Sequence, residues 1–115
     1  MPYIPKKDRK RLDVLIRQLG DEIEKVGDEY CKKENGNRAA YAGFFNYSVS
    51  QLVGRFARRN FRYWNIALLS GVLENIKDEF YRRVAILYED EKIRIDSDIS
   101  EYKEISKIIN NKNNL

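Results

Sequence analysis

Apolar positions recur every three or four residues along most of the chain, which is the spacing of one face of an α-helix. The first stripe predicts a helix over residues 6–26, weakened at Gly20 by about 1 kcal/mol relative to alanine. Residues 27–38 lose the pattern and are mostly polar, so we predict a loop there. The stripe consists of Leu12, Leu15, Ile16, Leu19, Ile23 and Val26.

A second helix is predicted over residues 39–59. Asn60 is expected to end it, because asparagine tolerates the left-handed conformation that often follows a helix. The side of this helix that we expect to be buried consists of Tyr41, Phe44, Phe45, Val49, Leu52, Val53 and Phe56.

In the third segment, residues 63–92, apolar residues keep the three-and-four spacing of a helix over a greater length than in any other segment. Thirty helical residues span roughly 45 Å, whereas a compact chain of this size has a radius of gyration of about 13 Å. Either the helix kinks near Gly71, or another subunit covers its end, and we favour the second. Its apolar positions are Trp64, Leu68, Leu69, Val72, Leu73, Ile76, Phe80, Val84 and Leu87.

A last amphipathic helix is predicted after Asp98, which stands three residues before Glu101 in the spacing of a capping box. Residues 1–5 form an arm, and residues 110–115 a frayed polar tail. We therefore predict a single all-α domain over residues 1–115. Its architecture is a helical bundle built on a long amphipathic helix hairpin, and it forms a homo-oligomer.

Composition argues against several classes of active site. The chain has no histidine and a single cysteine, so a zinc site or a nucleophile activated by histidine is improbable. We expect no catalytic residues, metal or cofactor, and we class the protein as a non-enzyme. No apolar run approaches the roughly 20 residues of a membrane span, and no signal peptide begins the chain, so a cytoplasmic location without membrane contact is expected.

Charged residues make up 35% of the chain, with a net charge of +4. Residues 55–64 combine four arginines with aromatic residues and contain no acid. Two interpretations stay open. Arginine can bind phosphate and aromatic faces can stack on a base, or Phe56 and Trp64 belong to the core and the arginines form a solvated face. The arginines are Arg55, Arg58, Arg59 and Arg62.

Two further charge patterns have an ordinary structural interpretation. The N-terminal cations oppose the helix macrodipole, so either a bound anion or acidic residues elsewhere compensate them. In the third helix, Asp78 and Arg82, and likewise Glu79 and Arg83, are four residues apart and predict intrahelical ion pairs. The N-terminal cations are Lys6, Lys7, Arg9, Lys10 and Arg11.

The segments 71–74, 79–84 and 88–93 resemble a family of short uncharacterised proteins from phage and bacterial genomes, whose pattern reads GVLE, EFYRR and YEDxKI. The resemblance extends to residues 43–47 and to the opening residues 2–5, and it covers most of residues 1–95. This chain departs from the family pattern at Leu87, where proline is common, and near residues 96–98. The last helix therefore resembles an extension. The family implies a phage or mobile-element setting but no activity.

The leading hypothesis for function is a small phage-type protein that sequesters a nucleotide-like ligand without chemistry. A cyclic nucleotide signal of host defence is one such ligand. The alternatives are an inhibitor or adaptor that docks on a host or phage protein, and a nucleic-acid-binding protein, which is less favoured. In the leading hypothesis, arginines hold phosphate and aromatic rings stack on a base. The candidate residues are Asn46, Tyr47, Arg58, Arg59, Trp64, Tyr81, Arg82 and Arg83.

Overall fold

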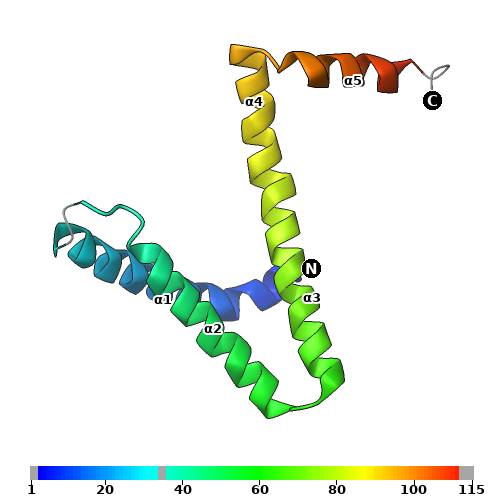
Figure 1. The fold of residues 1–115 in the computed structure, drawn as a ribbon. Helices are drawn as coiled ribbons and strands as arrows, with labels where there is room; N and C mark the ends of the chain where they lie inside the picture. Colours follow the sequence, from blue (N-terminus) through cyan, green and yellow to red (C-terminus); the bar gives the residue numbers. More distant parts are fainter. Residues whose placement is uncertain (1–2, 34–35, 112–115) are drawn as a thin grey trace. The chain divides into compact units, whose positions relative to one another are not determined.

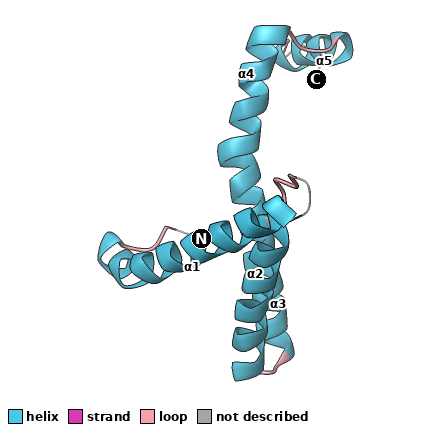
Figure 2. Cartoon of the chain, turned by 90° about the vertical axis from the view of Figure 1, so that its left-hand side faces the viewer, coloured by secondary structure: helices cyan, strands magenta, loops and turns pink. Residues whose placement is uncertain are grey.

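The computed structural model describes residues 3–33 and 36–111, and all regular secondary structure in these residues is helical (Figure 2). The predicted all-α class is therefore confirmed. None of the described helices combines the length and apolar content needed to cross a membrane. In chain order the elements are α1 (Lys6–Lys33), α2 (Tyr41–Arg59), α3 (Tyr63–Phe80), the π-helical segment η1 (Tyr81–Ala85), α4 (Ile86–Asp96) and α5 (Ser100–Asn110) (Figure 1).

The chain divides into two compact units, an N-terminal unit Met1–Glu74 and a C-terminal unit Asn75–Leu115. The N-terminal unit holds the hairpin of α1 and α2 and the first part of α3. The C-terminal unit holds the end of α3, η1, α4 and α5. The expected single domain stays a prediction.

Helix α1 is longer than predicted, because the segment from Gly27 to Lys33 is helical rather than part of a loop. Gly27 is buried, and a Cβ atom added to it would lie 2.8 Å from the Cβ atom of Tyr41 and 2.9 Å from its Cα atom. The missing side chain thus lets α1 and α2 approach closely, side by side (Figure 1). This glycine serves packing between helices and does not end the helix.

The turn between α1 and α2 is held by local hydrogen bonds. The Gly36 N–H donates to the carbonyl oxygen of Cys31 at 2.8 Å, and Gly36 has a φ of 85°, which favours glycine. The side-chain oxygen of Asn37 accepts from the Ala39 N–H at 3.1 Å. The predicted loop also includes residues 34–35, which lie outside the described residues.

Asn60 ends α2 as predicted, but its φ of −135° is not left-handed, so the expected conformation was wrong. The end of α2 is stabilised instead by Asn65, which is buried. Its Nδ2 group donates to the carbonyl oxygens of Phe56 and Asn60, both at 3.0 Å. A helix end lacks N–H partners for its last carbonyl groups, and one asparagine side chain from α3 supplies them here.

The expected buried side of α2 is mostly not buried. Phe44, Val49 and Val53 are half-buried, whereas Tyr41, Phe45, Leu52 and Phe56 are exposed. Among all described residues, no hydrophobic side chain is fully buried. The reason is that, among the described helices, only α1 packs along α2, and one neighbouring helix covers only part of an apolar face.

The third predicted helix is confirmed and extended, since the backbone is helical without a break from Tyr63 through Gly71 to Asp96. Over η1 the hydrogen-bond pattern widens, and the Ile86 N–H donates to the carbonyl oxygen of Tyr81, five residues back. Such π-helical turns are rare and often occur at functional sites.

Helix α5 confirms the last predicted helix but not its cap. The Asp98 carboxylate accepts from the adjacent Ile99 N–H at 2.8 Å, and no side-chain hydrogen bond caps the helix start. A capping box requires the acid at the N-cap position, and Ile99 occupies that position. Helix α5 runs to Asn110, the first residue of the predicted tail. Residues 112–115 of that tail and residues 1–2 of the predicted arm lie outside the described residues.

Ion pairs in the C-terminal unit join residues three apart. Arg82 donates to Glu79 at 2.6 Å rather than to Asp78, so the predicted pairing of Arg82 was wrong. In α4, Arg94 donates to Glu91 at 2.6 Å and lowers the pKa of its carboxyl group. Exposed pairs of this kind contribute little to stability.

Two glycines in α1 provide a matched test of the hairpin. Replacing Gly27 with alanine should lower the free energy of unfolding by about 1–3 kcal/mol, because the new Cβ atom overlaps Tyr41. Replacing Gly20 with alanine should raise the free energy of unfolding by up to about 1 kcal/mol, because nothing lies within 4 Å of the new Cβ atom and alanine favours helices. Urea unfolding followed by circular dichroism measures both. Equal gains in stability would contradict the close approach of α1 to α2.

Asn65 provides a second test. Asn65→Ala removes two hydrogen bonds to carbonyl groups at the end of α2, although the Asn60 carbonyl oxygen still accepts from the Arg62 N–H, and should cost about 1–3 kcal/mol. Asn75→Ala in the exposed part of the same helix is the control, and should be neutral or slightly stabilising because alanine favours helices. The midpoint of urea unfolding compares the two variants. If both variants leave the midpoint unchanged, Asn65 does not hold the turn.

Candidate ligand-binding groove

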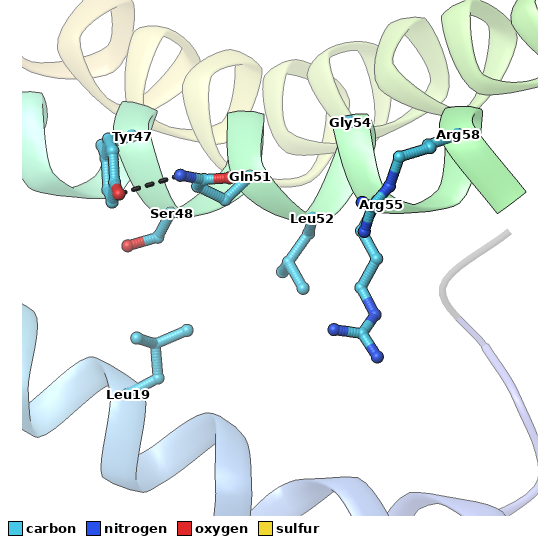
Figure 3. Close-up of a pocket in the computed structure, with 8 residues that line it drawn as sticks. All are labelled: Leu19, Tyr47, Ser48, Gln51, Leu52, Gly54, Arg55 and Arg58. Atoms are coloured by element: carbon cyan, nitrogen blue, oxygen red, sulfur yellow. Dashed lines mark hydrogen bonds between the residues drawn. The ribbon is translucent and has the colours of Figure 1, made fainter.

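A groove of about 630 Å³ lies between α1 and α2. Tyr47, Gln51, Arg55 and Arg58 of α2 follow one another at intervals of four, four and three residues, so they share one face of the helix. Figure 3 shows these side chains along α2, with Leu19 of α1 opposite. The lining residues are Leu19, Tyr47, Ser48, Gln51, Leu52, Gly54, Arg55 and Arg58.

The groove changes character along its length. Leu19 points from α1 toward α2 near Ser48, and Leu52 points from α2 toward α1, so both helices give the groove an apolar lining (Figure 3). At one end, the Tyr47 hydroxyl oxygen accepts a hydrogen bond from the Gln51 amide at 2.8 Å. At the other end lie the Arg55 and Arg58 guanidinium groups. An aromatic ring, an apolar lining and two cations suit a ligand that has a planar part and an anionic part.

The cations of the groove are not neutralised by their surroundings. Among the described residues, neither Arg55 nor Arg58 forms an ion pair. The sequence contains no acidic residue from Ala39 to Leu73. Because the arginines stand close together on one helix face, they repel one another until an anion binds.

A second hollow, of about 460 Å³, adjoins the arginine end and is lined by Arg55, Phe56, Arg58 and Arg59. It shares two arginines with the groove. The end of α2 therefore presents three arginines and one exposed phenylalanine along one hollow. They belong to the cluster for which the sequence left a phosphate-binding and a solvated interpretation open.

The predicted site residues of the N-terminal unit separate into three groups. Tyr47 and Arg58 line the groove, and Arg59 lines the neighbouring hollow. Asn46 faces elsewhere, since its side-chain oxygen accepts from Ser50 Oγ at 3.3 Å. Trp64 is exposed at the start of α3 and does not line the groove.

Tyr81, Arg82 and Arg83 belong to the C-terminal unit, where they form the first part of the π-helical segment. Arg82 is engaged by Glu79, whereas Tyr81 is half-exposed. Their share in ligand binding stays a prediction. The described residues contain no cluster of three or more acidic or cysteine side chains that could hold a metal ion.

Sequence reasoning missed Leu19 and Gln51 as members of the site, and it named Arg55 in the arginine cluster but not among the final candidate residues. The periodic spacing of Tyr47, Gln51 and Arg55 was a signal that could have identified Gln51 and Arg55. Nothing in the sequence pairs Leu19 with α2, because that contact depends on how the hairpin closes.

A family model, described as a domain of unknown function (DUF6899), matches residues 1–99. The chain belongs to the DUF6899 family. The DUF6899 match includes both units up to the residue before α5, in agreement with the expectation that the last helix is an extension. No curated protein and no solved structure matches the chain. The family description states no activity, so the function of this DUF6899 protein must be argued from its site.

Proposed function

We propose that this DUF6899 protein is a non-catalytic, homo-oligomeric binding protein that sequesters a nucleotide-like ligand in the groove between α1 and α2. Arg55 and Arg58 hold the phosphate groups, and Tyr47 stacks on the base. The setting is the one that the family resemblance implies, a phage or mobile element in a host cytoplasm, and the ligands of interest include cyclic nucleotide signals of host defence.

One observation carries the proposal: two arginines that form no ion pair with any described residue share a groove with an exposed tyrosine and an apolar lining. The groove volume of about 630 Å³ lies within the range of roughly 300–1,000 Å³ that is typical of small-molecule sites. Arginine binds phosphate oxygens through paired N–H groups, and bases stack on aromatic rings. These are the two kinds of contact that a nucleotide needs.

The uncovered apolar face of α1 supports the homo-oligomer. In the described residues of the N-terminal unit, α2 packs on α1 but leaves Leu15 and Ile16 61% and 62% exposed. A helix buries its apolar face only against another element, so contact with a further copy would cover these side chains.

The second candidate function is an adaptor or inhibitor that docks on another protein. The observation that favours it is the apolar stripe of α5, which packs on no other helix of its unit in the described part of the chain. Amphipathic helices of this kind bind grooves of partner proteins. The stripe consists of Ile99, Tyr102, Ile105, Ile108 and Ile109, all exposed.

Thermal unfolding with a panel of ligands tests the leading proposal. The panel contains mononucleotides, cyclic mono-, di- and trinucleotides, ADP-ribose and inorganic phosphate. A ligand at one hundred times its dissociation constant adds about 2.7 kcal/mol to the free energy of unfolding, which raises the melting temperature by several degrees. If no nucleotide raises the melting temperature while a host protein is recovered on the immobilised chain, the adaptor function replaces this proposal. Retarded nucleic acid in a salt-sensitive gel shift would favour nucleic-acid binding.

Substitutions locate the site once a ligand is found. Arg55→Ala and Arg58→Ala should each weaken binding at least about tenfold, because a hydrogen bond to a charged group contributes about 1.5–3 kcal/mol. Isothermal titration calorimetry measures the change.

Arg17→Ala is the matched control, because Arg17 is also an exposed helical arginine but does not line the groove. It should bind as the parent chain does. Arg83→Ala tests the predicted contribution of the C-terminal unit. If the Arg17 and Arg58 variants lose ligand affinity equally, the groove is not the site.

A further inference from the structure

The N-terminal half of α1 has an apolar stripe that no other described helix of its unit covers. Leu12, Leu15 and Ile16 are 49%, 61% and 62% exposed, whereas Ile23 and Val26, nearer the close contact at Gly27, are half-buried. Helix α2 therefore covers the stripe only toward the C-terminal end of α1. The first four turns of α1 present leucine and isoleucine side chains that another helix has to cover.

The two halves of α1 carry opposite charge. Residues 6–17 hold six cations and two acids, whereas residues 21–29 hold five acids and one cation. This arrangement opposes the helix macrodipole, which favours acids near the N-terminus and cations near the C-terminus. Helix α2 cannot compensate the cations, because the chain has no acidic residue from Ala39 to Leu73.

We propose that α1 pairs with α1 of a second copy, antiparallel, about a two-fold axis beside Ile16. Antiparallel pairing places the basic half of each helix against the acidic half of the other and opposes the two macrodipoles. The exposed stripes of the two copies then cover one another near the axis. This inference rests on the homo-oligomer of the proposed function, and it specifies the surface that joins the copies.

Arg11 and Glu22 form the specific polar contact of this interface. They are eleven residues apart, about three helical turns, so they lie on the same side of α1. Both flank the apolar stripe, and an axis beside Ile16 brings Arg11 of one copy opposite Glu22 of the other. Within the described residues, neither side chain has an ion-pair partner.

The partner is a second copy because the surface is complementary to itself. A two-fold interface brings the same patch of both chains together, which requires matching positive and negative segments on one surface at equal distances from an axis. The basic and acidic halves of α1 meet this requirement. A nucleic acid would match only the basic half, and a cationic protein only the acidic half.

Charge reversal tests the pairing. Arg11→Glu and Glu22→Arg should each raise the dissociation constant between copies by about ten- to thirtyfold, since each variant turns two attractive contacts into repulsive ones. The double variant should restore it to within about threefold of the parent. The two residues are too far apart along one helix to contact each other, so rescue can arise only between copies. Analytical ultracentrifugation at several salt concentrations measures the constants, and circular dichroism confirms folding.

Covalent trapping provides a second measurement that other contacts between copies do not obscure. In a Cys31→Ser background, Ile16→Cys should form a disulfide-linked dimer on mild oxidation, because the two copies of this residue meet at the axis. Val14→Cys, equally exposed but on the opposite side of the helix, is the control and should stay monomeric on a non-reducing gel.

The outcomes separate this inference from the proposed function. If copies associate but the double variant is not rescued and Ile16→Cys does not crosslink, the α1 pairing is wrong and another surface joins the copies. A chain that is monomeric at micromolar concentration overturns both the pairing and the proposed oligomer. Ligand binding in the groove is measured separately, so its absence leaves the α1 pairing standing.

Discussion

The helices of this DUF6899 protein bear more apolar surface than their own packing covers. A helix buries its apolar face only against another element, and among the described residues of the N-terminal unit the one close pair is α1 with α2. That pair depends on Gly27, where the absence of a side chain lets the backbone of Tyr41 come within van der Waals distance. Away from this point the stripes of both helices stay partly open.

The same geometry produces the groove. Because α1 and α2 touch at Gly27, the side chains farther along the hairpin are separated by space rather than packed together. Leu19 and Leu52 face this space, and Arg55 and Arg58 stand at its end (Figure 3). An incomplete core and a ligand-sized groove are thus two consequences of one contact.

Charge segregation accompanies the uncovered apolar surface. Helix α1 is basic in its first half and acidic in its second, and α2 contains arginine but no acid. Within one chain the cations of both helices repel each other and gain no ion pairs in the described residues. Such a pattern favours binding of an anion in the groove and of a second copy along the α1 stripe.

The local sequence was sufficient to predict the helices, but not the residues at which all of them end. The three-and-four spacing of apolar residues correctly predicted every long helix, because that spacing reflects a single helix and needs no partner. The end of α1 was mispredicted because a glycine that ends a helix and a glycine that admits a neighbouring helix look the same in sequence. The end of α2 at Asn60 was predicted, but the hydrogen bonds that stabilise it were not, since Asn65 reaches back across a turn that only the folded chain forms.

The sequence likewise determines some features of the candidate site, and the tertiary structure determines the others. Sequence by itself determined that arginines and aromatic residues concentrate between residues 55 and 64, that α2 has no acid, and that Tyr47 and Arg55 share a helix face. Only the tertiary structure decided that Leu19 of α1 faces that side of α2 and that Trp64 does not line the groove. The physical reason is distance along the chain. Periodicity and charge are properties of neighbouring residues, whereas this groove depends on where two helices that are separated in the chain touch and where they leave space between them.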